Sequence, residues 1–213
     1  GAGERLASAG DQESLGPCGE NRLFGDTWLL TLGGGGDAAS TWERVAAARR
    51  ADDAPPPRSS HVCAIWGAAG AAILHGGLGN DGTMADVWML GELDHGWQRC
   101  ETDGARVARA HHCGGITRDE LLIFSGQDEG LLTTDTICIL ELRSFRWSVC
   151  TMPGGPHARI DASAAAIDGL GLVVFGGVGS EFEFVKSTPW LIAPTGENAV
   201  TSWSAVSPWG KVG

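Results

Sequence analysis

Histidine and cysteine side chains gather at two points of the sequence where they could bind a metal ion. His61 and Cys63 lie at the first point, and His111, His112 and Cys113 lie at the second. Zinc favours four nitrogen or sulfur ligands, so side chains from both points would suit it. However, His61 and His112 each follow an arginine by three residues. We therefore favour one repeated structural position used twice, and expect no metal and no cofactor.

Two further cysteines also occupy a repeated position. Cys100 and Cys150 each stand three residues after a tryptophan, where Val45 stands in another part of the chain. This indicates small core side chains. The sequence has 6 cysteines and no Cys-x-x-Cys pair, which favours a reducing compartment over a disulfide-built secreted scaffold.

Three arginines, Arg58, Arg109 and Arg159, recur at intervals of 51 and 50 residues. They could together grip a carboxylate, but the regular spacing favours one structural role, in which the five-donor guanidinium binds loop carbonyl groups between repeats. Two residues after each arginine the residue type changes, and a variable position in a constant frame is where we expect recognition. These variable residues are Ser60, His111 and Asp161.

Glycine-rich segments could cradle a phosphate group. GGGG at 33–36 and GGLGNDG at 76–82 are the candidates, but neither is followed by the lysine and Ser/Thr of a phosphate loop. They are typical of turns. No paired carboxylates stand out either, so the residues predict a protein that is not an enzyme.

A repeat of about fifty residues would position all these side chains. Apolar runs that end on glycine occur as AILHGG (72–77), LLIFSG (121–126) and LVVFGG (172–177). Each is followed by a strand-like run, at 86–90, 135–140 and 188–192, and then by a tryptophan-bearing run, at 96–100, 145–150 and 201–206. With the segment that starts at the arginine, each unit contains four strands, which we call A to D.

The first forty-five residues match strands B, C and D of the same unit. RLASAG (5–10), DTWLLTL (26–32) and TWERV (41–45) stand at these places. We therefore divide the chain into a partial unit at 1–45, a linker at 46–57, full units at 58–103, 104–150 and 151–206, and a tail at 207–213.

This phased set of marks resembles the kelch-repeat family, over residues 4–206. The marks are arginine at the start of strand A, the glycine pair after strand B and tryptophan in strand D, with Ser125 replacing one glycine. The resemblance implies an all-β kelch-type β-propeller, whose blades are four-stranded sheets arranged around a channel. About four blades are present, the first lacking its innermost strand, and we expect them to form part of a larger ring. A second copy or a closed four-bladed ring are the other options.

Kelch packing suggests a partner for the glycine pairs. We expect bulky rings to lie against this bare backbone, where a Cβ would clash. The glycines are Gly76, Gly77, Gly126, Gly176 and Gly177, and the expected rings are Trp42, Trp97, Trp147 and Trp203.

The loops between strands B and C gather acidic residues on one face of such a propeller. These are Asp81, Asp128, Glu129, Glu181 and Glu183, with Phe182 among them. We expect them, with Ser60, His111 and Asp161 at the channel mouth, to bind another protein, for instance a basic segment. A merely solvated rim is the competing interpretation.

The overall composition limits the choice of partner. The net charge of -11 argues against nucleic acid. The longest apolar stretches, 62–74 and 170–179, are shorter than a bilayer span. We expect an intracellular, cytoplasmic scaffold or adaptor module, a subunit of a larger assembly, with import into an organelle left open.

Two alternative functions stay open at this point. Kelch propellers also occur beside catalytic domains such as phosphatases and methyltransferases, and some propellers act on sugars or other small molecules. A deep polar pocket at Ser60, His111 and Asp161 would favour the latter. A copper oxidase of the kelch-like type needs a tyrosine radical, and this chain has no tyrosine.

Overall fold

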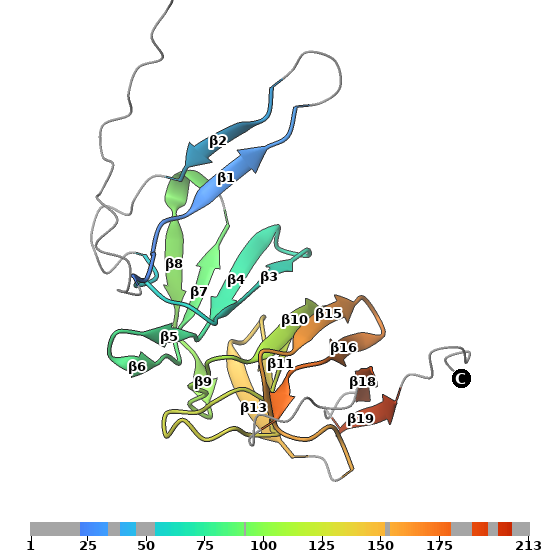
Figure 1. The fold of residues 1–213 in the computed structure, drawn as a ribbon. Coiled ribbons are helices and arrows are strands. Elements are labelled where there is room, and N and C mark those ends of the chain that lie inside the picture. The colour runs from blue at the N-terminus through green and yellow to red at the C-terminus, as the bar shows by residue number, and fades with distance from the viewer. Residues whose placement is uncertain are drawn as a thin grey trace, which may run out of the picture.

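The computed structural model describes residues 22–33, 39–45, 54–91, 93–151, 154–179, 189–195 and 200–205. In this part of the chain the regular elements are short strands and one 3₁₀ turn, Leu93–His95. The strands follow one another around an open arc, from β1 to β19 (Figure 1).

Three antiparallel sheets repeat the same order of strands. Blade 2 (residues 58–103) has the order β3-β4-β7-β8, blade 3 (104–150) has β10-β11-β12-β13, and blade 4 (151–206) has β15-β16-β18-β19. Blade 2 consists of β3 (Val62–Trp66), β4 (Ala71–His75), β7 (Val87–Leu90) and β8 (Trp97–Cys100). Blade 3 consists of β10 (Cys113–Thr117), β11 (Glu120–Phe124), β12 (Ile137–Glu141) and β13 (Arg146–Cys150). Blade 4 consists of β15 (Ser163–Ile167), β16 (Gly171–Phe175), β18 (Trp190–Thr195) and β19 (Val200–Ala205).

Smaller strands connect these sheets. A short hairpin in the loop between strands B and C of blade 2 is formed by β5 (Leu78–Gly79) and β6 (Gly82–Thr83). In blade 4, β14 (Arg159–Ile160) pairs with β17 (Val178–Gly179). β9 (Asp103–Gly104) runs parallel to the outer strand β13, so the linker from blade 2 crosses the edge of blade 3 before it turns inward.

Blade 1 is described as a two-stranded ribbon, β1 (Trp28–Thr31) paired with β2 (Thr41–Arg44). It holds the positions of strands C and D, as the sequence predicts. The strand B expected at 5–10 lies outside the described residues. Blade 1 joins blade 2 through Arg58, whose backbone N–H donates to the Phe24 carbonyl, and through Trp97, whose Nε1 donates to Thr27 Oγ1 at 2.9 Å.

The blades stack face to face because their strands are apolar on both sides. One buried cluster joins blades 2 and 3 and includes Ile73, Leu121 and Leu140. A second cluster joins blades 3 and 4 and includes Phe124, Ile139 and Ile192. The innermost strands β3, β10 and β15 contact each other in turn. The predicted all-β kelch-type propeller is confirmed as a fold class, and the described blades form an arc rather than a closed ring (Figure 1).

The expected tryptophan on the glycine pair is not found. A Cβ at Gly77 would lie 2.6 Å from the Ser59 carbonyl oxygen, and one at Gly126 would lie 2.5 Å from the Ala110 carbonyl oxygen. A Cβ at Gly76 would overlap the Arg109 carbonyl oxygen of the next blade. The glycines therefore make room for the backbone that leads into strand A, and Trp147 packs against the ring of His75 instead.

The start of strand A also differs from the expectation. We expected the arginine to open the strand, but β3 and β10 begin four residues after Arg58 and Arg109. The residues between them include one with left-handed backbone in each blade, such as Ser60 with φ 54°. Left-handed backbone cannot continue a β-strand, so pairing starts only after it.

Candidate functional site

The three variable residues form a row at the innermost edge of the blades. Ser60, His111 and Asp161 all have left-handed backbone, with φ of 54°, 56° and 54°. The His111 N–H donates to the Ser60 carbonyl at 3.1 Å, and the Asp161 N–H donates to the His111 carbonyl at 3.0 Å. The ring nitrogen Nδ1 of His111 lies 2.9 Å from Asp161 Oδ1. The structure thus brings all three together, one per blade, through backbone bonds that do not depend on residue type.

Arg58 is buried and binds groups within its own blade rather than between blades. Its guanidinium donates to the Gly76 carbonyl at 2.8 Å and to both carboxylate oxygens of Asp86 at 2.7 Å. Burial raises the pKa of Asp86, but hydrogen bonds from Arg58 and Trp88 outweigh this and hold the pKa below its ordinary value. The arginine therefore joins the start of strand A to the end of B and the start of C.

Arg109 and Arg159 occupy the same place in blades 3 and 4. Arg109 donates to Thr136 Oγ1 at 3.0 Å, and Arg159 donates to the Gly176 carbonyl at 2.9 Å. Both side chains are buried. Arginines so placed cannot converge on a ligand in the open channel.

Two histidines and a tryptophan are buried between blades 2 and 3. His75 Nε2 lies 2.9 Å from the Val107 carbonyl, and His75 Nδ1 lies 3.3 Å from His112 Nε2. A carbonyl only accepts, so His75 carries its proton on Nε2 and its Nδ1 accepts from His112. His112 Nδ1 and Trp147 Nε1 are buried without a partner in the described structure. Both histidines are therefore held in the neutral form.

Burial lowers the pKa of both histidines. The pKa of His75 falls from its ordinary 6.5 to about 4, and that of His112 falls well below 6.5 because of burial and the neighbouring His75. A proton on His75 Nδ1 would face the N–H of His112. The pair thus resists protonation while the blades remain packed.

This pair predicts acid-sensitive folding. Above pH 6.5 the histidines are neutral in both the folded and unfolded chain, so they leave stability unchanged. As the pH falls from 6.5 towards 4, the unfolded chain binds protons first, and His75 alone lowers the free energy of unfolding by up to roughly 3 kcal/mol. Urea unfolding followed at a series of pH values measures this loss.

The variant His75→Phe tests the origin of the acid sensitivity. Phe124 occupies the same register position in blade 3, so the side chain suits the site. The free energy of unfolding of this variant is expected to depend less on pH than that of the wild type, although the variant loses the bond to Val107. The exposed His157 provides a control in His157→Gln, which should keep the wild-type profile. An unchanged profile in His75→Phe would contradict the assignment.

The histidine and cysteine set does not converge. His61 and Cys63 are exposed, whereas His112 and Cys113 are buried in different surroundings. Among the residues that the structure describes, no group of three His, Cys, Asp or Glu side chains is placed to hold a metal ion. Cys100 and Cys150 are partly buried and pack against the two core clusters.

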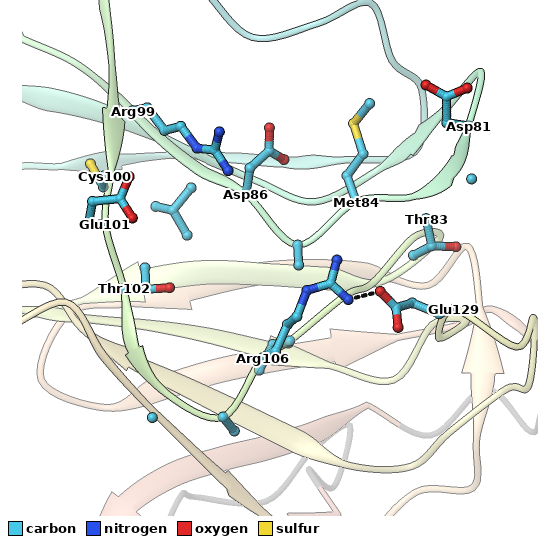
Figure 2. A pocket seen from close by; sticks show the side chains of 16 residues that line it. Asp81, Thr83, Met84, Asp86, Arg99, Cys100, Glu101, Thr102, Arg106 and Glu129 are labelled. Carbon is cyan, nitrogen blue, oxygen red and sulfur yellow. Dashed lines mark hydrogen bonds and ion pairs between the residues drawn. The ribbon is translucent and has the colours of Figure 1, made fainter.

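A cavity of about 700 Å³ opens beside the loops of blades 2 and 3 (Figure 2). It lies between the B–C loop of blade 2 and the linker that follows β8. Residues 81–87, 99–102, 104–107 and Glu129 line it. Four carboxylates, those of Asp81, Asp86, Glu101 and Glu129, face two guanidinium groups, those of Arg99 and Arg106. The lining of the cavity therefore combines polar and apolar groups, such as Met84 and Val107, and its charged groups have an acidic excess.

The ion pair between Arg106 and Glu129 separates this cavity from a second one of about 500 Å³. Both residues line both cavities, and both side chains are more than half exposed. Figure 2 shows the pair crossing the space between the linker and the loop of blade 3. Exposed pairs of this kind contribute little to stability and can exchange partners.

The other acidic loop residues have different surroundings. Asp81 is exposed at the tip of the β5–β6 hairpin. Asp128 instead shapes its loop, because its Oδ1 accepts from the N–H groups of Gly130 and Leu132 at 2.8 and 3.0 Å. Thr83 Oγ1 donates to the Asp128 carbonyl, which ties the loops of blades 2 and 3 together.

Two apolar side chains stand out from this loop. Leu131 and Leu132 are exposed by 61% and 68%. They follow Asp128 and Glu129 on a loop whose backbone is bonded to itself and to blade 2. Glu181, Phe182 and Glu183 lie outside the described residues. We call Asp81, Arg106, Glu129, Leu131 and Leu132 the loop face.

Comparison with known proteins identifies the class and then the family. The stacked four-stranded sheets define a β-propeller of the kelch type. The chain matches the family model described as the KLHDC2/KLHL20/DRC7 Kelch-repeats domain over residues 16–177, and it belongs to that family. No curated protein matches the chain. Domains of this family are generally non-catalytic modules for protein–protein interaction.

The residues described by the structure contain no helix long and apolar enough to cross a bilayer.

Sequence reasoning missed Arg106 and His75. His75 carried a signal, because Phe124 and Phe175 stand at the same place before the glycines. Arg106 carried no such signal, because it lies in a linker that has no residue repeated in the other blades. Its contact with Glu129 depends on how blade 2 stacks on blade 3.

Proposed function

We propose that this chain is a non-catalytic interaction module that binds a partner protein through the loop face. Membership of the family supports an interaction role, and the exposed residues of the loop face support the position of the binding site. The observation that carries the proposal is the exposure of Leu131 and Leu132 on a well-bonded loop beside an acidic cavity. Apolar side chains held in fixed positions lose little entropy on binding, so they suit an anchor.

The chemistry of the loop face favours a basic segment with apolar side chains. Glu129 is already paired with Arg106, so a basic side chain of a partner can take the place of Arg106. Asp81 and Glu101 supply further negative charge around the cavity. The net charge of -11 steers a basic segment towards the protein.

Binding of short peptides tests this proposal. A peptide that alternates lysine or arginine with leucine or phenylalanine should bind, and its acidic counterpart should not. The affinity should fall with added salt, because exposed charges are screened. Fluorescence anisotropy of labelled peptides measures both.

Variants of the loop face sharpen the test. Leu132→Ser should weaken binding about tenfold, as loss of an interface anchor does. Glu129→Lys should weaken it further and reduce its salt dependence. Leu93→Ser is the matched control, because Leu93 is 42% exposed but lies in the turn between strands C and D. That turn is at the other end of the strands from the loops between strands B and C. Equal losses in Leu93→Ser and Leu132→Ser, or binding that ignores salt, would refute the proposal.

A further inference from the structure

Two neighbouring cavities lie along the linker that joins blade 2 to blade 3. The first cavity, of about 700 Å³, lies between the B–C loop of blade 2 and the residues that follow β8. The second cavity, of about 500 Å³, lies between the same linker, the B–C loop of blade 3 and Val149 of β13. They share the lining residues Arg106, Val107 and Glu129. Each has the size of a cavity that binds a ligand, roughly 300–1,000 Å³.

The backbone of the linker is held on both sides of Arg106. Before this residue, β9 pairs with the outer strand β13 of blade 3. After it, the Val107 carbonyl lies 2.9 Å from His75 Nε2, and the Arg109 N–H donates to the Met84 carbonyl at 3.0 Å. The linker therefore follows a fixed path, and Arg106 changes position through its side chain alone.

The backbone that carries Glu129 is held in a similar way. The neighbouring Asp128 accepts the N–H groups of Gly130 and Leu132 at its Oδ1. Figure 2 shows the Arg106 and Glu129 side chains meeting between the linker and this loop. They are 68% and 55% exposed, and exposed ion pairs are weak. The barrier between the two cavities is therefore a pair of side chains held by a weak interaction.

The charges around the first cavity favour a cation at this barrier. Asp81 and Glu101 line the cavity and form no ion pair among the residues that the structure describes, against the one further cation Arg99. Once Arg106 turns away, Glu129 becomes another carboxylate without a partner. A basic side chain from outside would restore the interaction that Glu129 loses.

The second cavity offers an apolar contact next to the same barrier. Ala108 and Val149 line it, and Val149 is 46% exposed. The two cavities thus differ in chemistry, since the first has the unpaired carboxylates and the second has an accessible aliphatic side chain. A segment that crosses the barrier would meet both.

We propose that the two cavities open into one groove, which holds an extended basic segment of a partner protein across the linker. We call the joined cavities the interblade groove. A lysine or arginine of the segment displaces Arg106 from Glu129, and an apolar side chain beside it contacts Val149. Arg106 is then an internal competitor of the partner. The segment is extended because one ion pair now fills the gap that it crosses, and a helix is about 10–12 Å wide. This inference rests on the proposed binding of a basic segment at the loop face.

Removal of the internal competitor is expected to strengthen binding. Arg106→Gln should bind a labelled peptide of alternating basic and apolar residues about two- to fivefold more tightly than the wild type, because no ion pair has to break. Arg143→Gln is the matched control. Arg143 is 70% exposed and pairs with Asp119, but it lies in the turn between strands C and D, at the other end of the strands. It makes the same change in net charge, and fluorescence anisotropy measures both affinities.

Peptides that contain citrulline show whether a basic side chain meets Glu129. Citrulline has nearly the shape of arginine without its charge. Citrulline in place of the crossing arginine, found by replacing each arginine in turn, should weaken binding to Arg106→Gln about two- to fivefold. It should have little effect when Arg106→Gln is combined with Glu129→Gln.

A further variant tests the second cavity. Val149→Ser should weaken binding of the peptide about threefold, because an apolar contact is lost. A peptide held helical by a side-chain staple should bind more weakly than the linear peptide.

The outcomes separate this inference from the proposed function. If the peptide binds but Arg106→Gln gains no more than Arg143→Gln, Arg106 is not a competitor and the inference is wrong, while binding at the loop face stands. Unchanged binding in Val149→Ser, or tighter binding of the helical peptide, would also overturn the inference. Failure of basic peptides to bind the wild type and every variant would overturn the proposed function as well.

Discussion

Replacement of Gly76 by valine is expected to prevent folding or to lower the free energy of unfolding by more than about 4 kcal/mol. Gly76 has φ +65°, a conformation that a β-branched residue avoids. Its Cβ would also overlap the Arg109 carbonyl oxygen, which accepts the N–H of Gly77 at 2.8 Å. The backbone leading into blade 3 would have to move. Soluble yield, circular dichroism and urea unfolding measure the effect.

Another glycine separates the effect of crowding from that of backbone conformation. Gly70 has φ +61°, but no atom of the residues that the structure describes lies within 4 Å of where its Cβ would be. Gly70→Val is therefore expected to cost only about 1–2 kcal/mol for the left-handed conformation. If Gly76→Val proved as stable as Gly70→Val, close packing of the blades at Gly76 would be disproved.

The second large effect is expected at the buried ion pair. Arg58→Met removes both bonds to Asp86 and the bond to the Gly76 carbonyl. The Asp86 carboxylate would remain largely buried and, among the described residues, would keep Trp88 Nε1 as its one side-chain donor. Breaking one side of such a pair costs about 3–5 kcal/mol. Urea unfolding at neutral pH measures the loss.

Two further variants show whether the charge is responsible. Arg58→Met combined with Asp86→Asn should be more stable than Arg58→Met alone, because the amide needs no counter-charge. Arg146→Met is the exposed control, since its pair with Asp103 is open to solvent on both sides. That variant should change stability by no more than about 1 kcal/mol. Equal losses in Arg58→Met and Arg146→Met would contradict a buried structural role.

The repeat made most of the fold predictable. The runs ending on glycine, the strand-like runs that follow them and the tryptophan-bearing runs placed strands B, C and D within three residues of β4, β7 and β8 and their equivalents. A stacked repeat must bury the same positions in every copy. The arginine, the glycine-ended run, the strand-like run and the tryptophan are each weak evidence, but together, recurring in one order, they are strong evidence for the fold. The start of strand A was the exception, because the left-handed residues such as His111 carry no mark in the sequence.

The packing of the glycines could not be predicted in this way. Sequence showed that each glycine pair needs close contact, but it could not show which group makes it. The contact is a backbone carbonyl, as at Gly126 with Ala110. Every residue has a backbone carbonyl group, so the residue types in a sequence do not indicate which carbonyl makes the contact. The prediction that tryptophan rings lie against the glycines was therefore wrong.

The candidate site was likewise predicted only in part from the sequence. The sequence predicted acidic loops on one face, but not that Asp128 would shape its loop or that Glu129 would meet Arg106. Ser60, His111 and Asp161 were predicted from their phase, and the structure lines them up. Their binding role remains a prediction.

By itself, the sequence determined the class of fold and the residues that recur, because a repeated unit shows its own period in the order of its residues. Only the tertiary structure decided which groups meet between blades. It set the neutral His75–His112 pair and the Arg106–Glu129 pair. Such contacts depend on how one sheet is rotated and stacked on the next, and residues far apart in the chain carry no record of that geometry.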